Sequence, residues 1–379
     1  MRRRHFVTGL AGVTAGLGLG AVPQAATAVG ASARQRLGRT AQGWQQAAVP
    51  PGAEAARLLK AAAAGPDCAW AVGEQARNGS APGRPLAVHW DGAAWSHTDL
   101  THLGFAGAVV EVAGTSPEAA WAIGGDTGDG SGHLLRWDGA TWQDADFPGR
   151  GDAGTSLSAV TVADDGRAWA AGVHDGRARL LHWDGRVWRW LPPLPEGTAA
   201  LWNVHLAPDG SVWVSRDAIA RWDHRSWTVL PVPAGIRLTV TGLLPVAPDD
   251  AWAVGAAFGP GGPPGKPPSV VLARWNGTEW LSDREALPFT VGALHSIVGD
   301  ARGRPALISG WDFWDGTRTH YLRRSGDGWT GERGPLAEGL TPMMTDLATV
   351  PGTDTVWAVG TTTRYSTQPP AQLRIERYG

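Results

Sequence analysis

A phrase that recurs seven times along the chain predicts an all-β fold, a seven-bladed β-propeller with four-stranded blades. Each copy contains a strand of small residues, a Trp-Ala-Val-Gly-like strand, a variable loop, and then Leu-x-Arg-Trp-Asp-Gly-x-x-Trp before a Pro-containing linker. The first Trp of the phrase is replaced by Leu307 in the sixth copy and otherwise falls at Trp70, Trp121, Trp169, Trp213, Trp252 and Trp357. Trp70 and Trp357 are 287 residues apart, which over six intervals is about 48 residues per copy, a blade-sized period.

Each copy divides into four short strands, named A to D from the centre of the ring outward. Strand A is small and β-branched, as in Ser156–Ala163, and a turn such as Asp165-Gly166 leads to strand B. Asp-Gly between strands C and D predicts a tight hairpin, because Gly accepts a positive φ. Facing blades are close at the centre and splayed at the rim, so small residues suit strand A and large Trp side chains fill the widening space between B, C and D.

The two ends of the sequence predict how the ring closes. The C-terminal segment 374–379 matches strand C of the repeat and has no strand D after it. The segment 43–50 has the form of the strand D segment 141–148, so Trp44 is expected to supply the outer strand of the last blade. A propeller closed by its N-terminal strand has no free sheet edge at the junction.

The segment before the repeat has the composition of an export signal. Residues 2–7 are basic and end in Phe-Val, residues 9–22 are apolar and Gly-rich, and Ala26-Thr27-Ala28 and Ala31-Ser32-Ala33 each offer a small-residue cleavage site. Two arginines, a spacer and a Phe resemble the twin-arginine consensus, with an ordinary Sec signal as the alternative. We therefore expect an export signal over 1–33, a linker over 34–41, a propeller over 42–379, and a secreted, extracellular product with no membrane anchor after cleavage.

Charge and composition narrow the class of partner. The formal net charge of −2 lacks the basic excess of a nucleic-acid-binding protein, so no nucleic acid is expected as a partner. The single Cys68 excludes an internal disulfide. The sequence also predicts a monomer and no cofactor. Eighteen of the 22 Trp residues occupy repeat positions and are read as core, which leaves Trp190, Trp202, Trp311 and Trp314.

The second copy resembles kelch-like propellers, a group that includes the central domain of galactose oxidase. Gly124-Gly125, Trp137-Asp138 and Trp142 carry the resemblance, which extends over roughly residues 42–379. The chain departs from kelch in keeping one Gly in most blades and in using Trp where kelch has Tyr, and it looks closer to tryptophan-rich exported bacterial propellers. The resemblance implies the fold rather than an activity. The copper-radical chemistry of galactose oxidase is not expected, because Cys68 falls on the face opposite the candidate site.

The Trp residues outside the repeat give the main candidate ligand contacts. Trp202, Trp311 and Trp314 fall where the B–C and D–A connections emerge on one face, and exposed indoles there would stack on a sugar ring or an apolar ligand. The alternative is that they plug the channel mouth or pack on neighbouring loops. Asp126, in the loop after Gly125, is grouped with them as a ligand contact. The loop lacks the spacing and closing Glu of a calcium site, so no metal is predicted.

Two functions remain open. The first is an exported, non-enzymatic binding propeller that recognises a glycan, a cell-wall component or a protein through its B–C loop face. The alternative is a propeller enzyme, a lyase or hydrolase, that uses dispersed residues at the channel mouth, with His205, His295, Glu111 and Asp346 as candidate catalytic residues. A purely structural surface protein would show a featureless loop face.

Overall fold

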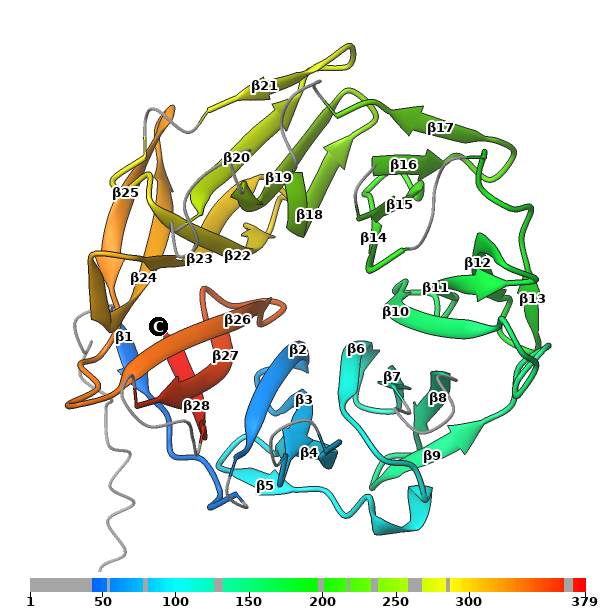
Figure 1. Ribbon diagram of the computed structural model, residues 1–379, viewed down its shortest axis with the longest axis horizontal. Helices are drawn as coiled ribbons and strands as arrows, with labels where there is room; N and C mark the ends of the chain where they lie inside the picture. The colour runs from blue at the N-terminus through cyan, green and yellow to red at the C-terminus, as the bar shows by residue number, and fades with distance from the viewer. Residues whose placement is uncertain are drawn as a thin grey trace, which may run out of the picture. The chain divides into compact units, whose positions relative to one another are not determined.

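The structure is a computed structural model that describes residues 43–52, 55–77, 81–125, 132–196, 201–216, 219–232, 238–257, 268–283, 287–364 and 371–379. The predicted export signal and linker lie outside these residues. The unit that spans Gln42–Gly379 consists of seven four-stranded antiparallel sheets arranged in a ring (Figure 1). The prediction of a seven-bladed β-propeller is therefore confirmed.

Within blades 1 to 6 the strands follow chain order from the centre outward, and in blade 7 the outer strand is the N-terminal strand β1. Blades 1 and 2 are β2 (Arg57–Gly65), β3 (Cys68–Gln75), β4 (Arg84–Trp90) and β5 (Trp95–His97), then β6 (Val109–Ser116), β7 (Ala119–Gly125), β8 (Gly132–Trp137) and β9 (Trp142–Ala145). Blades 3 and 4 are β10 (Ser156–Val162), β11 (Ala168–His174), β12 (Arg177–Trp183) and β13 (Trp188–Trp190), then β14 (Asn203–Leu206), β15 (Val212–Ser215), β16 (Ile219–Trp222) and β17 (Trp227–Leu230). Blades 5 and 6 are β18 (Leu238–Ala247), β19 (Asp250–Ala257), β20 (Ser269–Trp275) and β21 (Trp280–Ser282), then β22 (Gly292–Gly299), β23 (Pro305–Asp312), β24 (Asp315–Ser325) and β25 (Gly328–Arg333). Blade 7 is β26 (Thr341–Thr349), β27 (Val356–Thr363), β28 (Gln372–Tyr378) and β1 (Trp44–Gln46), and a 3₁₀ helix, η1 (Thr101–Leu103), follows β5.

The N-terminal strand β1 completes blade 7, as predicted. It pairs antiparallel with β28, with Trp44 opposite Tyr378. Trp44 stacks on Tyr321 of blade 6 with ring centroids 3.5 Å apart, and its indole N–H donates to Glu332. Closure thus joins the first strand of the chain to both blade 7 and the neighbouring blade 6.

A buried polar network supports the same junction. Glu376 on β28 accepts hydrogen bonds from the Tyr321 hydroxyl at 2.8 Å and the Thr319 hydroxyl at 3.1 Å, and it pairs with the buried guanidinium of Arg374. Arg374 also donates to the Pro335 carbonyl at 2.8 Å. Because every charged group in this network has a partner, it can be buried at low cost and it holds blades 6 and 7 in one arrangement.

The hydrophobic core divides into seven clusters, each made by two neighbouring blades. The strand B Trp of one blade meets the Trp residues on strands C and D of the next blade. Trp70 of blade 1, for example, packs edge-on against Trp137 and Trp142 of blade 2 at 5.9 and 6.4 Å between ring centroids. Edge-to-face packing of this kind is favoured by the charge distribution of aromatic rings. The repeat Trp residues are therefore wedges between blades, as predicted.

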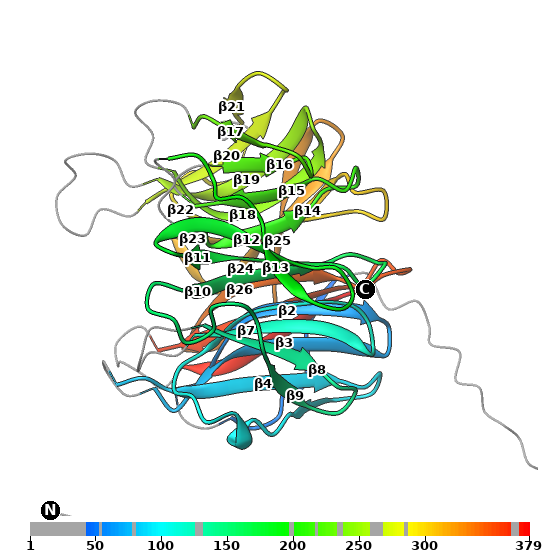
Figure 2. The same ribbon diagram turned by 90° about the vertical axis from the view of Figure 1, so that its right-hand side faces the viewer.

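The Asp-Gly turns between strands C and D also match the prediction. The Asp138 carboxylate accepts the backbone N–H groups of Ala140 and Thr141 at 2.9 and 2.8 Å, and the equivalent Asp or Asn does the same in blades 1, 3, 4 and 5. Gly139 has φ +100°, which only Gly adopts without strain. Figure 2 shows the strands from the side, with the turns gathered at two opposite faces of the ring.

One segment predicted as a loop is mostly strand. The sequence predicts a variable B–C loop over 311–319 in blade 6, but in the structure β23 continues to Asp312 and β24 begins at Asp315. The B–C connection of blade 6 is therefore a hairpin with Phe313 and Trp314 at its turn. Among the described residues, no helix is long and apolar enough to cross a membrane.

Candidate functional site

The inner strands share a β-bulge that decides which side chains face the axis. Six of the seven A strands shift register at the same place, for example between Leu58 and Lys60 in β2. Figure 1 shows the A strands lining the centre of the ring. One position on the inner strand is equivalent in all seven blades. It lies two residues before the residue that pairs with the strand B Trp, or with Leu307 in blade 6. The seven residues at this axial position are Lys60, Glu111, Ala159, Asn203, Gly242, Ser296 and Asp346.

Hydroxyl groups at the bulge itself fix neighbouring blades to one another. The Thr345 hydroxyl lies 3.0 Å from the Leu58 carbonyl of blade 1 and 3.1 Å from the Val359 carbonyl of its own blade. The Thr241 hydroxyl lies 2.7 Å from the Leu294 carbonyl of blade 6. A bulge leaves backbone groups unpaired in the ladder, and a hydroxyl at that point satisfies them across the gap between blades. The axial side chains are thus carried on a rigid inner ring.

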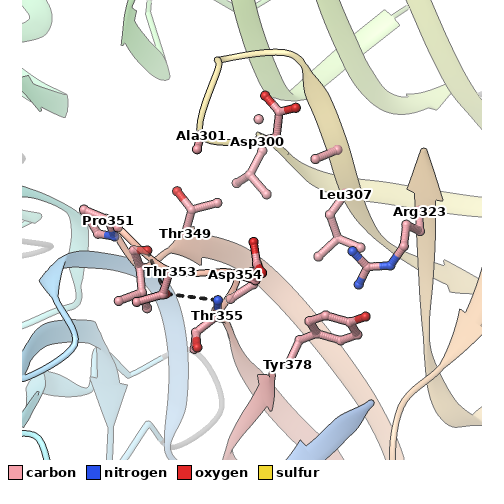
Figure 3. A pocket seen from close by; sticks show the side chains of 16 residues that line it. Asp300, Ala301, Leu307, Arg323, Thr349, Pro351, Thr353, Asp354, Thr355 and Tyr378 are labelled. Carbon is pink, nitrogen blue, oxygen red and sulfur yellow. Dashed lines mark hydrogen bonds between the residues drawn. The ribbon is translucent and has the colours of Figure 1, made fainter. Parts of the chain in front are cut away.

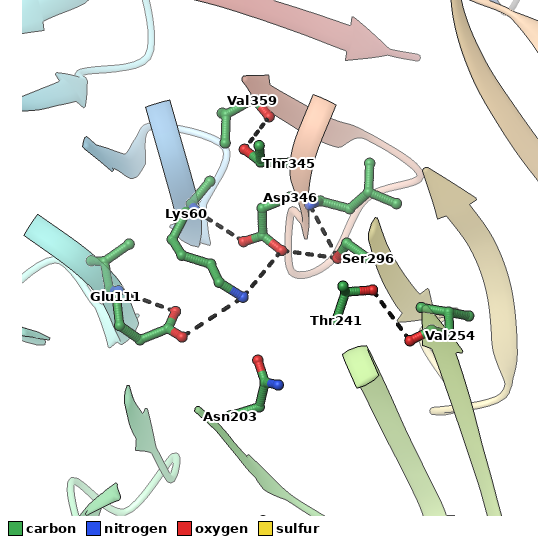
Figure 4. Close-up of polar contacts among 12 residues, drawn as sticks. Lys60, Glu111, Asn203, Thr241, Val254, Ser296, Thr345, Asp346 and Val359 are labelled. Atoms are coloured by element: carbon green, nitrogen blue, oxygen red, sulfur yellow. Dashed lines mark hydrogen bonds and ion pairs between the residues drawn. The ribbon is translucent and has the colours of Figure 1, made fainter. Parts of the chain in front are cut away.

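Three charged axial residues come together and form what we call the axial cluster: Lys60, Glu111 and Asp346 (Figure 4). The Lys60 ammonium lies 3.7 Å from the Glu111 Oε2 and 3.8 Å from the Asp346 Oδ1. The side chains are 22%, 12% and 11% exposed in that order, so water reaches the cluster although most of its surface is covered. The three residues come from β2, β6 and β26, which meet only in the folded ring.

Asp346 is held firmly in this arrangement. Its Oδ1 accepts the Ser296 hydroxyl at 2.9 Å, and its Oδ2 accepts the Ala61 backbone N–H at 3.1 Å. Ser296 in turn accepts the backbone N–H of Leu347 at 3.3 Å. Glu111 has a weaker support, since its Oε1 accepts only the N–H of its neighbour Val112, at 3.3 Å. One carboxylate of the pair is therefore fixed by neighbouring blades and the other is freer to take a new partner.

Burial and charge change the acidity of the axial cluster. Burial raises the pKa of Glu111 to about 7, with the charge of Lys60 opposing the rise and that of Asp346 adding to it. Burial disfavours the charged form of Lys60, but the carboxylates of Asp346 and Glu111 outweigh this and raise the pKa of the ammonium. Lys60 therefore remains a cation, while Glu111 exchanges a proton near neutral pH.

The two candidate histidines lie on the inner strands of blades 4 and 6, His205 on β14 and His295 on β22. Burial lowers the pKa of His205 to about 3, with a smaller effect from the Lys60 charge, and burial lowers the pKa of His295 to about 4. Both are neutral at physiological pH, and the Nε2 atom of each is buried without a hydrogen-bond partner among the described residues. The structure thus brings Glu111 and Asp346 together through Lys60, with His205 within reach of the Lys60 charge. His295 occupies the bulge position of blade 6.

The aromatic candidates form a second feature, at the face where strands B end and strands A begin. Trp314, at the turn of the β23–β24 hairpin, is 77% exposed. Its ring meets Phe313 edge-on at 4.9 Å, and Phe313 meets Trp311 edge-on at 5.8 Å. The Trp314 backbone N–H donates to the Asp312 carboxylate at 3.0 Å, which fixes the turn. We call Trp311, Phe313 and Trp314 the aromatic hairpin.

Trp202 emerges on the same face from blade 4. It is 48% exposed, and the guanidinium of Arg216 lies over its ring at 4.1 Å, a cation–π contact. Trp190, by contrast, is part of β13 and stacks on His174 at 4.8 Å, so it covers a blade edge. Asp126, the remaining candidate ligand contact, lies outside the described residues.

The opposite face has a hollow of about 310 Å³ between blades 6 and 7 (Figure 3). Its charged lining residues are Arg323, Asp300 and Asp354. Arg323 lies over the Tyr378 ring at 4.0 Å and pairs with Glu332, and Asp300 pairs with Arg304, so the cation of the hollow already has its partners. No group of three or more His, Cys, Asp and Glu side chains within the described part of the chain is placed to hold a metal ion.

The sequence indicates five of these residues, namely Glu111, Asp346, Trp202, Trp311 and Trp314, but Lys60 was not predicted. A signal for Lys60 is nevertheless present in the sequence. Lys60 is one of only two lysines in the chain, and it stands in an inner strand that the repeat otherwise fills with small residues. Ser296 and Asn203 were not predicted either, because small polar residues do not stand out in a strand A.

Comparison with known proteins shows the fold alone. No protein-family model matches the sequence, and no curated protein matches it either. Among solved structures, the chain is similar to YCF48 bound to D1 peptide (14% identity over 88% of this chain and 96% of that one, TM-score 0.57). It is also similar to U3-55K (11%, 89% and 98%, TM-score 0.59) and to a catalytically inactive virginiamycin B lyase from Staphylococcus aureus with quinupristin (13%, 89% and 99%, TM-score 0.57).

Proposed function

We propose that this chain is an exported binding propeller that holds a glycan on the face carrying the aromatic hairpin and Trp202. The observation that carries the proposal is Trp314, an indole that is 77% exposed at the tip of a hairpin whose other aromatic rings support it. An exposed large aromatic side chain on a fixed backbone leaves apolar area in water that a ligand can cover. The C–H face of a sugar ring carries weak positive charge and packs well on the negative face of an indole.

The support for the proposal comes from rigidity as well as exposure. The backbone bond from Trp314 to Asp312 and the edge-on contacts of Phe313 limit how far the indole can move. A ligand that stacks on Trp314 therefore loses little affinity to the ordering of the protein. Trp202, whose ring is covered on one side by Arg216, offers a second platform on the same face.

Retention on insoluble polysaccharides tests this proposal. Purified protein is incubated with cellulose, chitin and peptidoglycan, and the bound fraction is measured. Trp314→Ala should weaken retention about tenfold or more, as expected for an aromatic anchor, and Trp314→Phe should retain part of the affinity. The matched control is Leu281→Ala, which removes an exposed apolar side chain from the outer strand β21.

Equal retention of Trp314→Ala and the parent protein would refute a stacking role for the hairpin. Failure of the parent protein to bind any of the polysaccharides would leave a protein ligand as the better explanation of the aromatic face. We also propose, on the sequence motifs alone, that the chain is related to kelch-like propellers.

Export is a separate part of the proposal. Fusion of residues 1–41 to a reporter enzyme should direct the reporter out of the cytoplasm. Replacing Arg3 and Arg4 with Lys should block this for a twin-arginine signal, which depends on the guanidinium pair, and should change a Sec signal little. Loss of export only when the apolar segment 9–22 is disrupted would favour Sec.

A propeller enzyme is the second candidate function, favoured by Glu111 beside Lys60. A carboxyl group with a pKa of about 7 can donate or accept a proton at physiological pH, and an adjacent ammonium can stabilise developing negative charge. Screening of 4-nitrophenyl glycosides and esters would test for turnover. Glu111→Gln should abolish any turnover found, whereas Trp314→Ala should not affect a small substrate.

A further inference from the structure

The axial cluster has an imbalance of charge. One ammonium, that of Lys60, faces two carboxylates at 3.7 and 3.8 Å, so the cluster carries a net charge of −1 when both acids are ionised. These distances are longer than hydrogen bonds, and water has access to all three side chains. A partly covered site with an excess negative charge is stabilised by a further positive charge.

A proton can supply that charge, and Glu111 is where it binds. The pKa of about 7 at Glu111 arises because burial penalises a carboxylate that shares the Lys60 cation with Asp346. The neighbouring strand β10 presents Ser158 and Ala159 there, which do not titrate, and His205 and His295 are already neutral. Near neutral pH, Glu111 is therefore the group in the cluster that changes its charge.

The surroundings of the axial cluster have hydrogen-bond acceptors to spare. The Asn203 amide N–H₂ donates to the Ser215 hydroxyl at 3.1 Å and to the Val240 carbonyl at 3.3 Å, and its carbonyl oxygen accepts no hydrogen bond from the described residues. In Figure 4 the carbonyl oxygen of this amide points toward the Lys60 ammonium. The buried Nε2 atom of His205 also has no partner among the described residues, and it accepts a hydrogen bond when the proton is on Nδ1. A ligand that brings both positive charge and N–H donors fits this set.

A divalent metal fits it less well. Mg²⁺ and Ca²⁺ require about six or more oxygen ligands, more than two carboxylates and one amide supply, and Lys60 repels a double charge about twice as strongly as a single one. An ammonium group has one charge and up to three directed N–H donors, which matches two carboxylate oxygens and a neutral acceptor.

We propose that the axial cluster is a binding site for an organic ammonium group, the protonated amine of a small ligand, which takes the place of the proton on Glu111. This inference is independent of glycan binding at the aromatic hairpin, since it uses none of the same residues. The amine could belong to an amino sugar or to a simple alkylamine, and the two sources are separated by the choice of probe.

The scarcity of lysine makes the test direct. Lys60 and Lys266 are the only lysines in the chain. Reductive methylation with ¹³C-formaldehyde keeps the charge of each amine and gives one dimethyl NMR signal per lysine, besides that of the N-terminus. Lys60→Arg assigns the signals, and the Lys266 signal serves as an internal reference. The probes are glucosamine and methylammonium, with glucose as the neutral match for glucosamine and sodium chloride as the inorganic cation.

At pH 8 the Lys60 signal should shift saturably with glucosamine or methylammonium and not with glucose. Affinity for methylammonium, which stays protonated over this range, should be about tenfold higher at pH 8 than at pH 6, because the fraction of Glu111 that is ionised changes by that factor around a pKa of about 7. Glu111→Gln, which makes the cluster neutral, should abolish the shift. Calorimetry on the unmethylated protein should reproduce the pH dependence.

Binding of both amines would identify a general ammonium site, and binding of glucosamine alone would identify an amino sugar site. The proposal is overturned if no amine shifts the Lys60 signal at pH 8, if glucose acts like glucosamine, or if sodium alone produces the same shift at the same concentration. Should Glu111→Gln fail to fold, the comparison between pH 6 and pH 8 in the parent protein still decides, since a pH-independent affinity contradicts competition with a proton.

Discussion

Replacing Glu111 with Gln should change how the stability of the propeller depends on pH. Burial raises the pKa of Glu111 from its ordinary value of 4.5 to about 7. The folded protein therefore holds this proton more tightly than the unfolded chain, and the resulting stabilisation is fully present below pH 4.5 and is lost as the pH rises through 7. The pKa values in the folded and unfolded states differ by about 2.5, and each unit corresponds to about 1.36 kcal/mol. The total change in the free energy of unfolding is therefore about 3 kcal/mol.

Between pH 5 and pH 8, titration of Glu111 should lower the free energy of unfolding of the parent protein by about 2.5 kcal/mol. This contribution should be absent from Glu111→Gln. Urea denaturation curves followed by Trp fluorescence at pH 5, 6, 7 and 8 measure the free energy of unfolding of both proteins. The difference between the two proteins cancels other titrating groups. Glu118→Gln, the same change at an exposed turn of blade 2, controls for the loss of one carboxyl group. A difference that stays constant from pH 5 to pH 8, or that changes in the opposite direction, would refute the assignment of neutral-range titration to Glu111.

Four further substitutions have expected outcomes in the same denaturation assay. Glu376→Ala should cost about 3–5 kcal/mol, because it leaves the buried Arg374 guanidinium without its carboxylate; a loss below about 1 kcal/mol would mean that water compensates the cation. His205→Gln should reduce the acid sensitivity of the protein, since a histidine whose pKa is lowered to about 3 destabilises the fold as the pH falls below 6.5, by about 2 kcal/mol at pH 5; an unchanged pH profile would contradict this. Trp44→Ala should cost about 2–3 kcal/mol by weakening ring closure, whereas Trp314→Ala should change stability by no more than about 0.5 kcal/mol; equal effects of the two would argue against the closing role of β1.

The fold could be predicted from this sequence because the repeat reports on packing between blades. The Trp on strand B touches the Trp residues of the next blade, so the same contact is encoded seven times, with Leu307 in the one copy that lacks the Trp. Closure could be predicted for the same reason, since residues 43–50 repeat a strand D pattern that has no other partner. The hairpin at Trp314 was harder to predict, because its aromatic residues and its two Asp residues do not alternate regularly. An irregular pattern of this kind is typical of a loop.

The axial cluster could be predicted only in part, because it depends on register. A bulge shifts the alternation of strand A by one residue, and a pattern read with strict period two assigns the following side chains to the wrong face. Aligning the seven inner strands on their strand B partners would have placed Lys60, Glu111 and Asp346 in one column. The distances between them are set by ring closure, which brings β26 beside β2 from the far end of the chain.

The same contacts that form the axial cluster also connect blades across the closing junction. Ser296 of blade 6 bonds Asp346 of blade 7, Asp346 accepts the Ala61 N–H of blade 1, and Lys60 faces Glu111 of blade 2. A ligand bound here would therefore contact blades 1, 2 and 7 at once, whereas a ligand on the aromatic hairpin would contact blade 6 alone. Since a ligand stabilises the state that binds it by an amount that rises with its concentration relative to Kd, an axial amine should slow the local opening that allows amide hydrogen exchange in β1 and β28, where the ring closes. A ligand held only by the aromatic hairpin should leave exchange in these two strands unchanged, so hydrogen exchange distinguishes occupancy of the axis from occupancy of the face.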